Sequence, residues 1–298
     1  MQSRRSAYLL SALMNEEINS RIRLFDAIEG GSPFWSREIA EFGALQVLNS
    51  LCDGIYDGDK FARIISRLSS KSADELLHEV HSLQAIFIPP DDSLWPQSLN
   101  SLSNPPIGLV VKGDATCLSK PQLGIVGTRN PTNYGLRNAG EFASGFVDRG
   151  WVITSGGAYG IDSAAHRGAL FAEGETIAVI ATGIDVNYPV GNQRLFHEIS
   201  ESGALVSEVM PGVNAIPSRF LTRNRLIAAL SNATLVVEAA FRSGSLRTAR
   251  DAAELLRPVM AIPGPINSPT SEGCHRLIGE RAAEIVTSVG DAVEFLSI

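Results

Sequence analysis

QLGIVGTRNPTNYGLRNAGEFASGFVDRGWVITSGGAYGID, residues Gln122–Asp162, contains two successive strand–loop–helix units. The apolar run Leu123–Val126 ends at a glycine turn and is followed by an amphipathic stretch from about Tyr134 to Val147, which predicts a strand and a helix. A second apolar run, Trp151–Thr154, meets another glycine-rich turn before a second helical stretch. Because carboxyl ends of parallel strands meet at one edge of a sheet, the two loops are expected to lie side by side.

Both loops have the composition of an anion-binding turn. Glycines let backbone N–H groups point outward, and the following helix adds positive potential, so phosphate is the expected ligand. Arg129 strengthens this interpretation because a guanidinium can fork onto phosphate oxygens. The alternative is that the glycines only permit tight turns, and Asp162 is expected to cap the second helix. The candidate binding residues are Gly127, Thr128, Arg129 and Asn130 in the first loop and Ser155, Gly156, Gly157 and Gly160 in the second.

Neither loop carries a standard nucleotide fingerprint. The sequence has no G-x-x-x-x-G-K-[ST], which excludes a P-loop NTPase. No G-x-G-x-x-G follows the first strand, and Thr154 and Ser155 stand where an acidic residue would close the second. We therefore expect no dinucleotide cofactor, and no other cofactor or metal site is predicted.

Composition limits the class of protein. The chain has 298 residues, of which 44% are hydrophobic and 19% charged, as in a globular protein with one large α/β domain and a small accessory one. A net charge of −7 argues against a basic coat for duplex DNA but leaves room for a local basic groove. Three widely spaced cysteines support neither a disulfide framework nor a zinc site. The apolar run Tyr8–Met14 is too short for a signal or membrane segment, so a cytoplasmic protein is expected.

Two domains are predicted, a small helical domain at 1–83 and a core at 84–298 that opens with a lead-in segment at 84–106. Helical patterns before residue 83 include one over Ser36–Leu51. After Gly160, strands and helices alternate, which predicts an α/β fold with a doubly wound, mostly parallel Rossmann-like sheet. The expected strands are Ile107–Val111, Thr176–Ala181, Ala204–Val206, Thr234–Val237 and Val259–Ile262, and the expected helices are Asn192–Ser200, Thr222–Leu230 and Ser245–Leu256.

The stretch Ser218–Pro258 is locally basic, with seven arginines against three acids, or 7 − 3 = +4. Such a contrast with an acidic chain is typical of a confined anion-binding groove. An Arg-Asn-Arg triplet is expected to begin the helix Thr222–Leu230 and to point at the sheet edge. Two further helix starts could add phosphate contacts. The residues concerned are Arg223, Asn224 and Arg225 in the triplet, Asn192 and Arg194 at one helix start, and Ser243, Gly244 and Ser245 at the other.

Aromatic residues make up only 7% of the chain, so stacking on bases would be limited. The candidates near the loops are Tyr134, Tyr159, Tyr188 and Phe196.

From about Phe87 onward, several strings together resemble one family, the DNA-processing protein A family (DprA, also called Smf). They occur in that family's order and approximate spacing. The strings are IVGTRNPTNYG, SGGAYGIDSAAHRGAL, TIAVIATGIDVNYPVGNQRLF, SEVMPG, FLTRNRLIAALSNATLVVEA, SGSLRTARDA and VMAIPGPINSPTSEGCHRLI.

The resemblance implies a Rossmann-like core that binds single-stranded DNA without catalysis and forms a homodimer through that core. It also implies a role in loading the recombinase RecA during transformation and recombination, and a small N-terminal helical domain. Some relatives carry a C-terminal winged helix; because the sequence ends at Ile298, that module is expected to be absent.

Two other classes of function remain open. A hydrolase could cleave a glycosidic bond with paired carboxylates, Glu238 or Glu208 together with Asp185 or Asp162. However, the P-G-G-x-G-T-x-x-E motif expected of such enzymes is replaced by SGSLRTARD. The second alternative is a protein that binds a small nucleotide or nucleoside.

Overall fold

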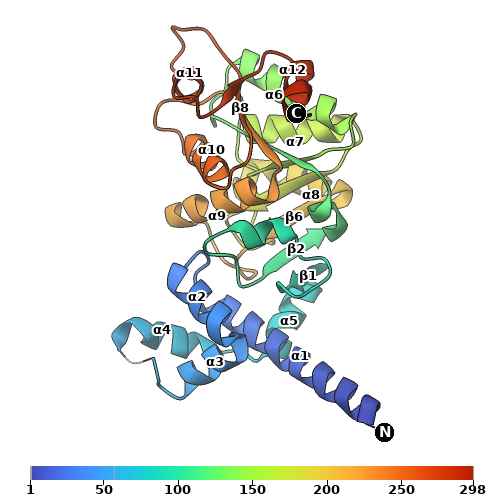
Figure 1. Ribbon diagram of the computed structural model, residues 1–298, viewed down its shortest axis with the longest axis vertical. Helices are drawn as coiled ribbons and strands as arrows, with labels where there is room; N and C mark the ends of the chain where they lie inside the picture. The colour runs from blue at the N-terminus through green and yellow to red at the C-terminus, as the bar shows by residue number, and fades with distance from the viewer. Residues whose placement is uncertain (1, 57, 298) are drawn as a thin grey trace.

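A single mixed sheet forms the centre of the molecule in this computed structural model, which describes residues 2–56 and 58–297 (Figure 1). Within those residues the sheet has nine strands in the order β1-β2-β6-β5-β4-β3-β7-β8-β9. β1 pairs antiparallel with β2, and β2 with β6, while all other pairs are parallel. The strands are β1 (Ala85–Ile88), β2 (Leu109–Gly113), β3 (Gln122–Val126), β4 (Val152–Ser155), β5 (Thr176–Ile180), β6 (Ala204–Ser207), β7 (Ala233–Val236), β8 (Val259–Ala261) and β9 (Glu284–Ile285).

Helices cover both faces of this sheet, which confirms the doubly wound α/β prediction (Figure 1). The central strands are buried along their whole length, as parallel strands between two helical layers require. One layer contains α6 (Asn133–Val147), α7 (Ile161–Phe171), α8 (Gln193–Ser202) and α12 (Val289–Leu296). The other contains α9 (Pro217–Leu230), α10 (Gly244–Glu254) and α11 (Glu272–Gly279).

The N-terminal part is helical, with α1 (Gln2–Ala27), α2 (Pro33–Phe42), α3 (Ala44–Cys52), α4 (Asp59–Leu68) and α5 (Ala73–Ser82). The prediction of one helix over Ser36–Leu51 is wrong, because the chain breaks at Gly43, where φ is +79°. That conformation is in the left-handed region, which glycine adopts without strain. One hydrophobic cluster joins this part to the core, running from Ile22 on α1 to Ile180 on β5.

The segment between α5 and β3 adds two short 3₁₀ turns, η1 (Gln97–Ser101) and η2 (Ala115–Ser119), and η3 (Val190–Asn192) precedes α8. The start of α9 matters most for function. It begins at Pro217, not at Thr222 as predicted, because proline is well placed at the first helical position. The Arg-Asn-Arg triplet therefore lies inside the helix.

Among the described residues, no helix is both long and apolar enough to cross a membrane.

Candidate functional site

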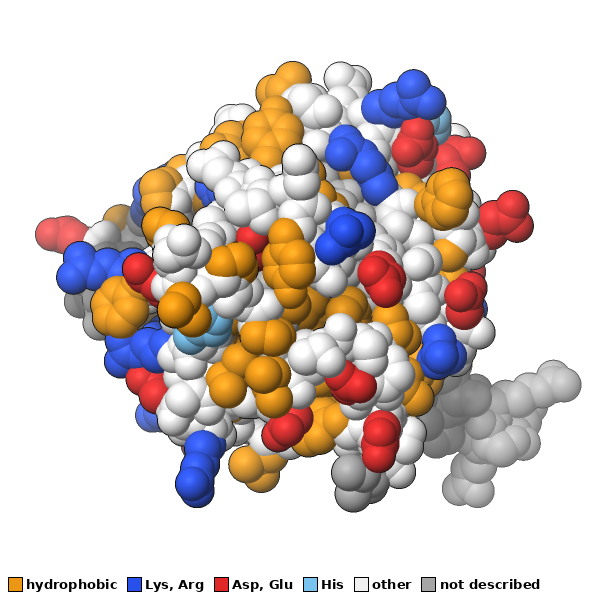
Figure 2. Space-filling model, turned by 90° about the horizontal axis from the view of Figure 1, so that it is seen from above, with side chains coloured by type: hydrophobic (Ala, Val, Ile, Leu, Met, Phe, Trp, Pro, Cys, Tyr) orange, Lys and Arg blue, Asp and Glu red, His pale blue; other side chains and the backbone are white. Residues whose placement is uncertain are grey.

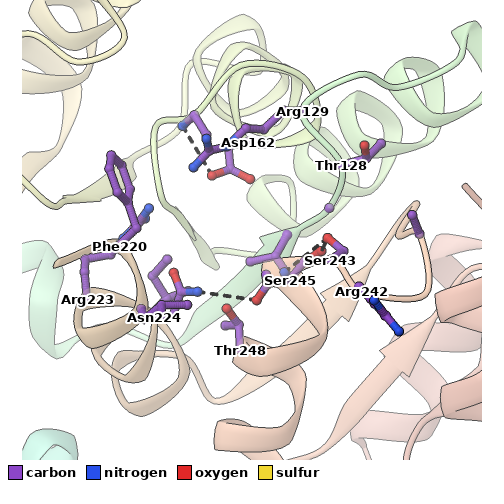
Figure 3. Close-up of a pocket in the computed structure, with 17 residues that line it drawn as sticks. Thr128, Arg129, Asp162, Phe220, Arg223, Asn224, Arg242, Ser243, Ser245 and Thr248 are labelled. Carbon is purple, nitrogen blue, oxygen red and sulfur yellow. Dashed lines mark hydrogen bonds between the residues drawn. The ribbon is translucent and has the colours of Figure 1, made fainter. Parts of the chain in front are cut away.

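A cavity lies where the direction of winding reverses, between β3 and β7. From β3 the chain continues through β4, β5 and β6 on one side of β3. It then crosses back to β7, which pairs with β3 on its other side. Loops that leave such strands diverge and open a crevice at the carboxyl edge. The cavity has a volume of about 450 Å³. It is bounded by the loop after β3, the loop after β7, the middle of α9 and the start of α10 (Figure 3).

The loop after β3 contributes Gly127, Thr128 and Arg129 to the lining. The Arg129 side chain is exposed, and its guanidinium carbon lies 5.3 Å from the centre of the Phe220 ring. Thr128 was predicted to bind phosphate in a loop of outward-pointing amides, but its own N–H donates to the Glu238 backbone oxygen at 2.7 Å and is not free for a ligand. Asn130 is exposed and does not line the cavity.

The second glycine loop lies beside the first, as predicted: the Ile161 N–H donates to the Thr128 oxygen at 3.1 Å. Two of its amides are already occupied, however. Those of Gly156 and Ala158 donate to Asp162 Oδ2 at 3.1 and 3.3 Å. These two amides are therefore satisfied by the protein's own Asp162 side chain. Asp162 therefore does not cap α7, whose N-cap is Gly160 with no side-chain hydrogen bond.

The other candidates in this loop have packing roles and do not line the cavity. A Cβ on Gly156 would lie 1.7 Å from Arg223 Nη1, and one on Gly160, where φ is +83°, would lie 2.3 Å from the Thr128 oxygen. Gly157 is similarly crowded by Phe196. Ser155 is buried and donates to the Ile125 oxygen at 2.6 Å. Close packing, the alternative reading of these glycines, explains them better than direct contact with a ligand.

Arg223 and Arg225 point in different directions because residues two apart on a helix lie on nearly opposite sides. Arg223 lines the cavity and donates to the Val179 oxygen at 2.8 Å. Arg225 is absent from that lining and forms a buried ion pair with Glu208. Asn224, between them, lines the cavity and donates to the Gly244 oxygen at 3.4 Å.

The two candidates at the start of α8 also lie outside the cavity. Asn192 is buried, and its Nδ2 donates to the Gly157 oxygen at 2.9 Å and to Ser163 Oγ at 2.8 Å. Asn192 therefore holds the second loop in place through its hydrogen bond to the Gly157 oxygen. The Arg194 side chain is 92% exposed and pairs with Glu198 at 2.8 Å. Surface pairing along a helix explains this contact without a ligand.

The third polar turn lies in the cavity wall. Ser243, Gly244 and Ser245 all line it, and Ser243 caps α10 by accepting the Ser245 N–H at 3.3 Å. Next to this turn, Arg242 is exposed and makes no hydrogen bond or ion pair with residues 2–56 or 58–297. Sequence reasoning did not single out Arg242 or Phe220 for the site. Pro217 is the sequence signal for the start of α9, because proline favours the first helical position, and that start places Phe220 in the first turn of the helix.

The electrostatics of the cavity favour an anion. Three arginines line it, Arg129, Arg223 and Arg242, against one carboxylate, Asp162. Burial raises the pKa of Asp162, while Arg223 and the loop amides favour its charged form. Burial also lowers the pKa of Arg223 to about 10, which leaves it positive at neutral pH. Two guanidinium groups, those of Arg129 and Arg242, have no carboxylate partner in the part of the chain that the structure describes.

Proton transfer by histidine has no support here. His166 is completely buried, its Nδ1 lies 2.7 Å from Thr176 Oγ1, and burial lowers its pKa to about 3. It is therefore neutral at physiological pH and packs against β5.

The fold and the site together define a Rossmann-like α/β protein with a cationic crevice at its switch point. The sequence profile of DNA recombination-mediator protein A matches residues 86–297, and the chain belongs to that family.

Similar proteins are found among curated sequences and among solved structures. DNA processing protein DprA of Streptococcus pneumoniae is 42% identical over 202 residues, which cover 68% of this chain and 71% of that protein. Protein Smf of Escherichia coli is 43% identical over 210 residues, 70% of this chain and 56% of that protein. A relative from Mycobacterium tuberculosis is 44% identical, and the match spans 57% of its length. The chain thus spans little more than half of these last two relatives.

The crystal structure of DprA from Streptococcus pneumoniae superposes with a TM-score of 0.79 at 35% identity, covering 91% of this chain and 95% of that one. A second structure, of DNA processing protein A from Helicobacter pylori, has a TM-score of 0.66 at 31% identity and covers 72% of this chain and 95% of that one. Its description concerns the single-stranded DNA binding mode of that protein.

Proposed function

We propose that this chain binds single-stranded DNA in the cavity between β3 and β7, protects the strand and helps to load RecA in recombination or transformation, in the cytoplasm. The observation that carries the proposal is the charge of the cavity. Arg129 and Arg242 are exposed and unpaired among the described residues, and the one carboxylate present is held by loop amides. Phosphate contacts of this kind supply most of the affinity for a strand and little sequence preference.

Aromatic side chains beside the cavity support a strand as the ligand. Phe220 lines the cavity, and its ring centre lies 5.4 Å from that of Tyr188, which is 46% exposed. Tyr159 is exposed as well. Bases stack on such rings regardless of sequence, at about 1–3 kcal/mol each. Two other predicted stacking residues do not fit: Phe196 is buried, and the Tyr134 hydroxyl donates to the Pro263 oxygen.

The positions and partners of the four candidate catalytic carboxylates agree with a binding role without bond cleavage. Glu238 accepts hydrogen bonds from the Thr132 N–H and hydroxyl, and Glu208 pairs with Arg225. Asp185 accepts the Gly212 N–H at 2.8 Å. Only Asp162 of the four lines the cavity. A glycosidase needs two carboxyl groups on either side of the scissile bond, so this arrangement favours binding.

The proposed partners are RecA and a second copy of this chain. The mediator role is supported by the family description, DNA recombination-mediator protein A. Exposed hydrophobic side chains support a homodimer through the core. Figure 2 shows them gathered near the centre of the face that lies at the end of the molecule farthest from α1–α5. Ile266, after β8, is 94% exposed, and Ile285, on the edge strand β9, is 47% exposed. Sedimentation velocity should show a dimer, and a monomer at every concentration would contradict it.

Binding of a labelled oligo-dT strand, compared with a panel of mononucleotides, tests the proposed function. We expect strand binding that weakens as salt rises, with a slope of about −0.7 in log affinity against log salt for each phosphate contact. No nucleotide should bind comparably and no product should be released. Tight mononucleotide binding would favour a small-molecule sensor, and release of a free base would favour a hydrolase; either result contradicts the proposal.

A further inference from the structure

A second cavity lies where the helical domain meets the core. Its volume is about 330 Å³. The turn after α1 and one residue of α4, Arg63, form one side, and the ends of β5 and β6 form another. The start of α9 closes it with Ile216, Ser218 and Arg219. The cavity therefore joins residues from both parts of the chain.

The carboxylates in this junction cavity are already neutralised. Glu29 forms a two-pronged ion pair with Arg219, through Nε at 3.0 Å and through Nη2. Glu208 is buried and pairs with Arg225, which lies outside the lining. Both carboxylates are therefore paired with arginines of the core and do not repel an incoming anion strongly. The hydrogen bond from Arg219 lowers the pKa of Glu29, and the nearby charges of Arg67 and Arg63 also act to lower it.

Positive charge remains once these pairs are counted. Arg63 is exposed and makes no hydrogen bond or ion pair with any residue in the described ranges 2–56 and 58–297. Arg223 also lines the junction cavity, so this one side chain borders both it and the cavity between β3 and β7. An anion in the junction cavity would meet Arg63 on the helical domain and Arg223 on the core.

We infer that a DNA strand bound between β3 and β7 continues past α9 into the junction cavity, where Arg63 contacts one of its backbone phosphates. The inference rests on the proposed function. Arg223 borders both cavities and so connects them. Arg63 supplies a guanidinium that has no hydrogen bond or ion pair within the described ranges. The helical domain is then part of the DNA interface in addition to its role in packing.

Charge-neutralising variants test this assignment in the full-length protein. Arg63→Gln removes the proposed contact, and Arg37→Gln removes another exposed positive charge, on α2, from a residue that lines neither cavity. Anisotropy titrations would use a short strand of about 6 nucleotides and a long one of about 30, within and well above the roughly 4–16 nucleotides that one single-strand-binding fold covers. Arg63→Gln should weaken long-strand binding several-fold and reduce the salt slope by about 0.7. It should leave short-strand binding unchanged, and Arg37→Gln should resemble the wild type with both strands.

The possible failures are distinguishable. If the wild type binds no strand, the proposed function fails and this inference with it. If the wild type binds but Arg63→Gln and Arg37→Gln behave alike on the long strand, the inference alone is overturned. That second outcome is also the one expected if the junction cavity takes only free phosphate or a mononucleotide.

Discussion

Glu208→Ala is expected to lower the free energy of unfolding by about 3–5 kcal/mol, the cost of breaking a buried ion pair by removing one partner. Glu208 is 8% exposed and pairs with Arg225, which is equally buried. Arg225 Nε and Nη1 have no hydrogen-bond partner among the described residues, so the variant would leave a buried guanidinium without its paired carboxylate. The carboxylate also packs against Gly30 in the turn after α1, so the docking of the helical domain should loosen as well.

Urea denaturation measures this effect, with Glu175→Ala as the matched control. Glu175 pairs with Lys120 at 2.6 Å on the surface, where such pairs contribute about 0–1 kcal/mol. Equal losses of stability in the two variants would show that the Glu208–Arg225 pair is not the buried contact described here.

Arg129→Ala should weaken strand binding by about 10- to 150-fold, because a hydrogen bond to a charged group contributes about 1.5–3 kcal/mol. The side chain is exposed and makes no ion pair among the described residues, so the variant should fold and melt like the wild type. Loss of its contact with Phe220 would also free that ring, which adds to the effect on the strand.

Arg194→Ala is the control for this measurement. It makes the same chemical change at a residue that the sequence also suggested for phosphate binding, but Arg194 lies on α8 outside the cavity. Anisotropy titration should show wild-type affinity for Arg194→Ala. Equal weakening by the two variants would mean that only overall charge matters and that the cavity is not the binding site.

Much of the fold could be predicted from the sequence because it depends on local pattern. Alternating apolar runs and glycine turns predicted the parallel strands, and the two loops after β3 and β4 do lie together. Resemblance to the family was confirmed by the match over residues 86–297.

The details of the site depended on tertiary geometry that no local pattern reveals. The amides of the second loop were predicted to be free for a ligand, but the Asp162 side chain accepts hydrogen bonds from two of them. Arg225 was predicted to bind the ligand, but it forms an ion pair with Glu208, which follows β6 and is distant from it in the sequence. One error was local: the start of α9 at Pro217 was missed, although proline at a first helical position is a recognised signal.

The most direct test of the binding site is a crystal or cryo-EM structure of the protein with a short oligo-dT strand. We predict density for a backbone phosphate between Arg129, Arg242 and the amino end of α10, with a base near Phe220. A strand bound elsewhere on the surface, with this cavity empty of DNA, would contradict the account.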